Sequence, residues 1–421
     1  MAKKTRATKY PLTMRQYLDL LKIAGVKRLI LSSLPGRLAY AMVQLATFFY
    51  VKEVTDSIAL AGLATGLEGI TSAATAGLRG TVIDRFGQFR PFLFFVPFWT
   101  LLLFAMTLST NTAWILTASA LVGFFSPPIN LAARPLWRDA VGPSRLRTAY
   151  AIDTTMMNTT TVVGPVVTTY LALQFSGETA LWMTSILMAI GGIAMMTMPL
   201  SRNWKPESAK PSARGLFKHR AFRIIVFEGM IFGFGWGLME ISIPAYSSLI
   251  ERPELSAPLL ATLAITSIVG GLIIGGRKSS ITPLNGFKVA GLAVAICAAP
   301  LAFTSPGFSM GFVLAALGLA LGFAQVYHWE TLEAIRPVGT ATSAQAWLWT
   351  LEGSMLAIGA AIGGFLVEKV NPQVALGLIS LCLLGATSYI WLYGSKHLQE
   401  ANKPLSEVKK VQALADLEEP T

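Results

Sequence analysis

The chain has 421 residues, of which 53% are hydrophobic and only 13% are charged, and its mean hydropathy is +0.56. Soluble domains carry about 25% charged residues, so this composition excludes a soluble protein and predicts a polytopic membrane protein. The two cysteines, Cys297 and Cys382, lie in apolar runs, which excludes a disulfide framework or a thiolate metal cluster.

Residues 1–28 are expected to form an N-terminal tail on the cytoplasmic side. The tail is basic and has no short apolar segment that ends in a small-residue cleavage site, so no removable signal peptide is predicted. Apolar residues recur at helical spacing within 8–28, which predicts a short amphipathic helix on the membrane surface.

Twelve apolar segments follow, each near the ~20 residues that a bilayer requires. Their polar side chains recur at helical spacing, which favours helices over barrel strands. The segments are 29–51, 57–78, 91–109, 113–133, 149–173, 179–199, 222–246, 256–275, 285–304, 308–328, 343–367 and 373–393. The predicted fold class is therefore an all-α membrane protein with twelve transmembrane helices.

A polar connection at 201–221 divides the segments into two groups of six. We expect an N-terminal bundle at 29–200, a cytoplasmic linker at 201–221 and a C-terminal bundle at 222–395. Similar small and polar residues lead into the fifth and eleventh segments, a weak internal repeat that fits two pseudo-symmetric halves around a midplane site. The tail at 396–421 is polar and is predicted to be cytoplasmic and disordered.

The distribution of cations predicts the orientation. If both termini are cytoplasmic, all but four of the 34 Lys and Arg residues fall on the cytoplasmic side, the exceptions being Arg37, Lys52, Arg252 and Lys369. The net charge of +12 is then explained by topology and contact with anionic lipid. A nucleic-acid partner is not expected, because the cations are spread over every inner loop.

A charged turn joins the second and third segments, with the sequence Gly80-Thr81-Val82-Ile83-Asp84-Arg85-Phe86-Gly87-Gln88-Phe89-Arg90-Pro91. Its pattern G-x-x-x-D-R-x-G resembles the loop between helices two and three of major facilitator superfamily transporters. The chain as a whole is similar to poorly characterised bacterial efflux permeases of that superfamily.

This resemblance implies two six-helix bundles and a conformational latch in the turn. In such transporters the acidic residue of the loop contacts a cation on helix four and the positive N-terminus of helix eleven, which keeps the inner side shut. Carried over, Asp84 and Arg134 would form the latch. Gly80 and Gly87 would permit close packing, and Arg85 and Arg90 would face lipid or the loop surface. The alternative is a basic loop that serves topology alone.

Ionisable side chains inside the spans are costly, so they are candidates for a transport pathway or a proton relay. The proton-coupling candidates are Glu352, Glu68, Glu228, Glu240 and His328. Polar and aromatic residues at helical spacing predict a substrate cavity lined by Arg37, Tyr40, Gln44, Asn130, Asn158, Trp236, Gln325 and Trp349. For each of them a structural interpretation stays open, namely a partner for a buried cation, an interfacial side chain or a packing residue.

No nucleotide-binding motif or zinc-protease motif occurs in the sequence, so we expect neither an ATP-driven pump nor an enzyme, and no cofactor or metal. The prediction is a secondary active transporter that exports a small organic molecule in exchange for protons. The partners expected are this molecule, protons and membrane lipid, and the predicted form is a monomer in a bacterial cell membrane. Proton-coupled import of a sugar or metabolite is one alternative, and a non-transporting sensor or scaffold is another.

Overall fold

The computed structural model describes residues 14–207, 213–277 and 281–403, and these form helices joined by short turns, without a strand among them. The N-terminal half contains α1 (Met14–Leu21), α2 (Ala24–Thr55), α3 (Ile58–Phe86), α4 (Phe89–Met106), α5 (Thr112–Phe124), α6 (Ile129–Val141), η1 (Pro143–Arg145), α7 (Leu146–Gln174), α8 (Gly177–Thr197) and α9 (Pro199–Arg202). The C-terminal half contains α10 (Ala213–Lys218), α11 (Arg220–Leu249), η2 (Pro253–Leu255), α12 (Ser256–Gly275), α13 (Pro283–Ala298), η3 (Ala299–Phe303), α14 (Phe308–Ile335), α15 (Ser343–Lys369), α16 (Pro372–His397) and η4 (Gln399–Asn402).

Ten helical segments among the described residues are long and apolar enough to cross a membrane. The two other long helices are α3 and α7, each of 29 residues, whose polar side chains lower their hydropathy. Together they make the twelve segments that the sequence predicts. The fourth segment consists of α5 and α6, because Pro127 and Pro128 interrupt the helix between them.

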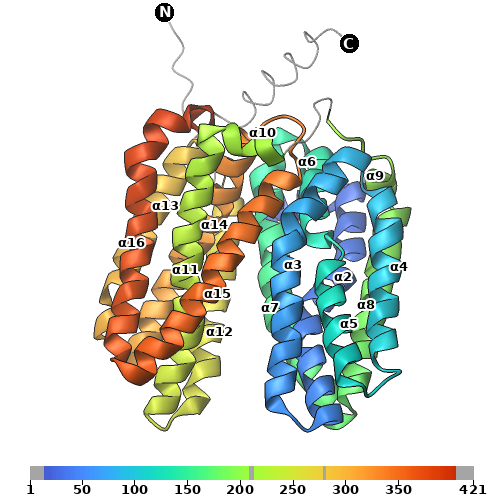
Figure 1. Ribbon diagram of the computed structural model, residues 1–421. Coiled ribbons are helices and arrows are strands. Elements are labelled where there is room, and N and C mark those ends of the chain that lie inside the picture. Colours follow the sequence, from blue (N-terminus) through green and yellow to red (C-terminus); the bar gives the residue numbers. More distant parts are fainter. Residues whose placement is uncertain (1–13, 208–212, 278–280, 404–421) are drawn as a thin grey trace, which may run out of the picture.

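The two halves form separate bundles, α2–α9 and α10–α16, which stand side by side in Figure 1. Within each bundle, small residues let helix backbones approach closely, as is common in membranes. Gly191 of α8 faces the backbone of Gly36 in α2, and Gly237 of α11 faces the backbone of Leu356 in α15. A β-carbon at either glycine would collide with the opposing helix.

The halves meet at one end of the molecule, which we call the basic end. It comprises α1, the α3–α4 turn at 87–88, α9, α10 and the connection 336–342 between α14 and α15, and it lies at the top of Figure 1. The hydrogen bonds between described residues of the two halves lie toward this end, such as those that Asp84 accepts from the start of α15 and those that Arg147 donates to α14. From there the ribbons of the two halves diverge (Figure 1).

The amphipathic helix predicted within residues 8–28 corresponds in part to α1. Its Tyr17 hydroxyl donates a hydrogen bond of 2.5 Å to the carbonyl of Leu272 in α12, so α1 is attached to the C-terminal half. The start of the predicted helix and the polar tail after 403 lie outside the described residues.

Candidate functional site

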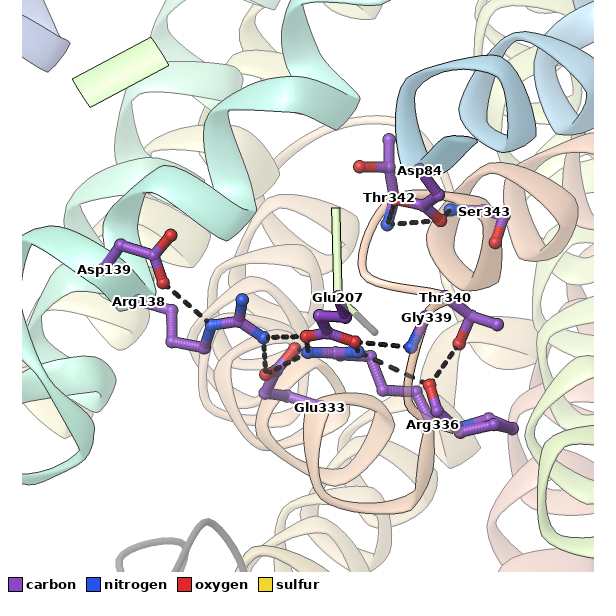
Figure 2. A network of polar contacts seen from close by, with 11 residues as sticks. Asp84, Arg138, Asp139, Glu207, Glu333, Arg336, Gly339, Thr340, Thr342 and Ser343 are labelled. Atoms are coloured by element: carbon purple, nitrogen blue, oxygen red, sulfur yellow. Dashed lines mark hydrogen bonds and ion pairs between the residues drawn. The ribbon is translucent and has the colours of Figure 1, made fainter. Parts of the chain in front are cut away.

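The carboxylate of Asp84 connects the two halves at the basic end. It is buried at the end of α3 and accepts hydrogen bonds from the backbone N–H of Thr342, at 2.8 and 3.0 Å, and from that of Ser343, at 2.7 Å (Figure 2). Those N–H groups begin α15, and an anion is favoured at a helix N-terminus. Asp84 therefore contacts helix eleven of the predicted count, as the motif implies.

Close packing of α3 against α15 brings Asp84 into position. A β-carbon at Gly80 would lie 2.5 Å from Cβ of Ala346, so a side chain larger than hydrogen would separate the helices. One turn earlier, the Gly77 N–H donates a hydrogen bond of 3.1 Å to Oγ1 of Thr350. Gly87 ends α3 with φ at +78°, a conformation that favours glycine. Arg85 and Arg90 are exposed, as the sequence predicts.

Arg134 does not pair with Asp84, so this part of the expected latch is wrong. Its Nε lies 3.1 Å from Oδ2 of Asp153 in α7, and Arg37 of α2 binds Oδ1 of the same carboxylate. The indole N–H of Trp137 donates a further hydrogen bond of 2.8 Å to Oδ1. The reason is that Asp84 already has backbone donors from α15, whereas fully buried Asp153 compensates two buried arginines. Arg37 therefore has a structural partner and does not line the cavity described below.

Arg134 nevertheless contacts the other half. The carbon of its guanidinium lies 3.5 Å from the ring centroid of Trp329 in α14, which is a cation–π contact across the interface. Arg147 of α7 forms a second link, because its Nε and Nη2 lie 2.8 Å from the two carboxylate oxygens of Glu330 in α14. Both contacts require the basic end to be closed.

The linker between the halves supplies a third link through Glu207. Its carboxylate lies 2.8 Å from Nη1 of Arg138 in α6, accepts two hydrogen bonds of 2.8 and 2.9 Å from Arg336, and accepts one of 2.6 Å from the Gly339 N–H. Glu333 contacts both arginines as well (Figure 2). Burial alone would raise the pKa of Glu207, but the hydrogen bonds and charge of Arg336, the charge of Arg138 and the Gly339 N–H lower it to about 2.

A cavity of about 280 Å³ lies on the C-terminal half, lined by residues of α11 to α16 and by one residue of α7. Six residues that the sequence predicts for the site line it, namely Asn158, Glu228, Trp236, Gln325, His328 and Glu352. Asn158 comes from α7 of the other half. The aromatic residues in the wall are Phe232, Trp236, Phe287 and Trp329.

The ionisable groups of the cavity are two carboxylates, one imidazole and one lysine. Nδ1 of His328 lies 3.4 Å from Oε2 of Glu228. Beyond this contact, no hydrogen bond to Glu228 or Glu352 is found among the described residues. Lys288 donates a hydrogen bond to Oγ of Ser395 and lies 5.4 Å from the ring centroid of Trp391. The cavity therefore presents carboxylates without fixed donors.

The other predicted residues lie outside this cavity. Glu68 is buried in the N-terminal half and accepts a hydrogen bond of 3.0 Å from Thr47. Glu240 is exposed on α11, Tyr40 and Gln44 are exposed on α2, and Asn130 is half-buried on α6. Trp349 packs edge-on against Trp329, with ring centroids 6.1 Å apart. Their proposed roles stay predictions.

Sequence reasoning missed the partners of the buried arginines, the polar network of the linker and one lysine in the wall of the cavity. The overlooked residues are Asp153, Glu207, Glu330, Glu333, Arg336 and Lys288. The sequence could have indicated a buried ion pair at Asp153, because this acidic residue lies inside a long helix with few other charged residues. Glu207 gave no such signal, since a single carboxylate in a basic linker resembles a solvated surface group.

Comparison with known proteins identifies the family. The family model described as Major Facilitator Superfamily matches residues 29–360. The chain belongs to the major facilitator superfamily. Members of this superfamily are membrane transporters, so the chain is a multi-pass membrane protein that transports a substrate. The curated proteins include no match to the chain.

Solved structures share this superfamily's fold. A bacterial homologue of the iron transporter ferroportin in an outward-facing state has a TM-score of 0.72 and 14% identity, over 88% of this chain and 100% of the other. The same homologue with soaked iron gives 0.68 and 13%, over 88% and 99%. The human organic anion transporter MFSD10 (TETRAN) gives 0.65 and 14%, over 89% and 97%. At these identities the likeness shows the fold alone.

Proposed function

We propose that this protein is a proton-coupled exporter of small amphipathic organic cations that works by alternating access. The observation that carries the proposal is the cavity in the C-terminal half, where Glu228 and Glu352 lie beside aromatic rings without fixed donors. Carboxylates together with indole and phenyl faces are the groups that bind an organic cation. The ammonium group of Lys288 contacts Ser395 and Trp391 and forms no ion pair with either carboxylate of the cavity.

The basic end is cytoplasmic in this proposal, because cytoplasmic loops collect Lys and Arg. The contacts of Asp84, Glu207 and Arg147 then close the cytoplasmic side, which makes the structure an outward-facing state. Transport requires these contacts to break while the halves close at the opposite end.

Protons and cargo compete for the same carboxylates. When Glu228 and Glu352 carry protons, the cavity loses the charge that holds a cation, so cargo leaves toward the side with the higher proton concentration. When the two carboxylates release these protons to the cytoplasm, the cavity regains the negative charge that binds the cation. His328 lies within reach of Glu228 and provides a third group that exchanges protons there.

The test uses purified protein with tetraphenylphosphonium and ethidium as probes. We expect both probes to raise the melting temperature and a pH gradient to drive their flux in proteoliposomes. Glu352→Gln should reduce this flux at least tenfold while the protein stays folded. Glu368→Gln is the matched control, because Glu368 is exposed on α15, the helix that also carries Glu352, and lies outside the cavity.

The alternatives give different results. Stabilisation by a neutral sugar but by neither cation would favour an importer, and unchanged pH-driven flux in Glu352→Gln would remove this carboxylate from coupling. A sensor or scaffold would transport no probe in either direction.

A further inference from the structure

A groove of about 470 Å³ lies at the basic end, on the outside of the N-terminal half. Its lining comes from the start of α2, the end of α6, α9 and the first part of the linker, including Arg28, Asp139, Trp204 and Lys205. The groove is separate from the cavity in the C-terminal half and shares no residue with it.

The groove carries uncompensated positive charge. Arg28 and Lys205 are exposed, and neither forms an ion pair with a described residue. The one carboxylate in the lining, Asp139, lies 3.1 Å from Nε of Arg138. Trp204 is buried and forms part of the floor. A cationic hollow of this kind favours an anionic group.

Apolar side chains continue from the groove along the surface that faces lipid. Ile186, Ile190 and Ile193 recur at helical spacing on α8 and are each more than half exposed, at 52%, 52% and 55%. This helix runs directly into α9, which borders the groove. On α2, Leu31 lies one turn beyond Arg28 and is 71% exposed. The surface therefore combines a place for a charged headgroup with a path for acyl chains.

The segment that forms the groove is connected to two of the contacts that close the basic end, those of Asp84 and Glu207. Ser201 donates a hydrogen bond of 2.8 Å to the side-chain carbonyl of Gln88 in the α3–α4 turn, next to the helix that carries Asp84. Two residues after Lys205, Glu207 binds Arg336 and Gly339 of the C-terminal half. A ligand that holds residues 203–205 in place therefore favours the closed arrangement of this end.

We propose that this groove binds the headgroup of an anionic phospholipid and that the bound lipid stabilises the closed basic end. Arg28 and Lys205 contact the phosphate, and the acyl chains lie along α8. The inference does not depend on what the C-terminal cavity transports.

The test is a titration of the purified full-length protein with short-chain phosphatidylglycerol, monitored by melting temperature. Phosphatidylcholine with the same chains and inorganic phosphate are parallel titrations. We expect phosphatidylglycerol alone to stabilise the protein. Arg28→Gln with Lys205→Gln should weaken its apparent affinity about 25-fold, since each cation near an anionic membrane surface contributes roughly fivefold. Lys52→Gln with Lys369→Gln removes two exposed cations elsewhere and should leave it unchanged.

Conformation is measured by spin labels at positions 90 and 218, which are exposed on the two halves at the basic end. In nanodiscs, phosphatidylglycerol should increase the short-distance population relative to phosphatidylcholine, and the Arg28/Lys205 variant should lose this increase. Equal stabilisation by phosphatidylcholine would overturn the proposal, and so would an unchanged affinity of the variant. An equal effect of inorganic phosphate would show an adventitious ion only and would overturn it as well.

Discussion

The buried charges of this protein are explained by their partners. Arg37, Arg134 and Asp153 lie in the interior of the N-terminal half, and a single carboxylate compensates two guanidinium groups there. Removing one partner of such a cluster leaves charge in a medium that solvates it poorly. The integrity of the half therefore depends on Asp153, although this residue contacts no part of the cavity.

Asp153→Asn should destabilise the protein by about 3–5 kcal/mol, because both arginines lose their counter-charge. Asp139→Asn is the control, since Asp139 is partly exposed, forms one ion pair and should contribute less than about 1 kcal/mol. Chemical unfolding in detergent measures both. A loss for Asp153→Asn no larger than that of the control would contradict this assignment.

Glu207 predicts the pH dependence of the closed basic end. Its pKa is lowered from 4.5 to about 2, so its contribution is complete above about pH 4.5 and is lost as the pH falls toward 2. Titration of Glu207 should therefore cause no change in the distance between spin labels at 90 and 218 from pH 5 to pH 8. Below pH 4.5 they should lengthen, and Glu207→Gln should remove that acid-induced component. Persistence of the same component in the variant would assign it to another group.

Among the elements, the contact between α3 and α15 controls how closely the halves approach. The two helices touch through Gly77 and Gly80 on one side and Ala346 and Trp347 on the other. Glycine at these positions leaves room for the methyl group of Ala346 and the indole ring of Trp347, so the two helices approach closely. Of the two motif glycines, Gly80 therefore serves helix packing, whereas Gly87 provides the backbone conformation that ends α3.

Gly80→Ala should shift the protein away from the closed basic end, because the new methyl group would lie 2.5 Å from Cβ of Ala346. The matched control is Gly66→Ala on the same helix, where an added β-carbon meets nothing within 4 Å. The labels at 90 and 218 report the shift as a longer distance. A change of the same size in both variants would indicate an effect on α3 itself rather than on its contact with α15.

At the scale of the whole molecule, the two halves are bundles joined by separate contacts at one end. Asp84 binds the start of α15, and Glu207 of the linker binds the end of α14 and its following turn. These contacts belong to different segments but resist the same motion. Opening therefore requires both to break, and their contributions should combine.

Asp84→Asn and Glu207→Gln should each weaken the closed state by about 1.5–3 kcal/mol, the range for hydrogen bonds to charged groups. The double variant should show roughly the sum, since the two carboxylates have no common partner. Labels at 90 and 218 should move apart, and labels at 52 and 252, near the opposite end, should approach each other. Simultaneous lengthening of both distances would indicate loss of structure instead of alternating access.

Much of the architecture follows from the sequence, because hydrocarbon imposes strong rules on any chain that crosses it. Segment length and apolarity predict the twelve spans, and the polar linker predicts the division into halves. The motif at Gly80–Pro91 predicts that Asp84 meets the start of α15, as it does. Helical spacing also indicates that Gln325 and His328 share one face of their helix, and both line the C-terminal cavity.

Tertiary structure decided which partner each charge takes. The resemblance to the superfamily implies a pair between Asp84 and Arg134, but Arg134 binds Asp153. Periodicity does not reveal this partner, because it shows which residues share a helix face and not which helix lies opposite. Glu207 links the two halves because folding brings Arg138 and Arg336, which are far apart in the sequence, to the same carboxylate. The sequence by itself determined which segments cross the membrane, because the solvation of each segment is a local property. The closing contacts depend on packing between distant helices, and only the folded chain specifies that packing.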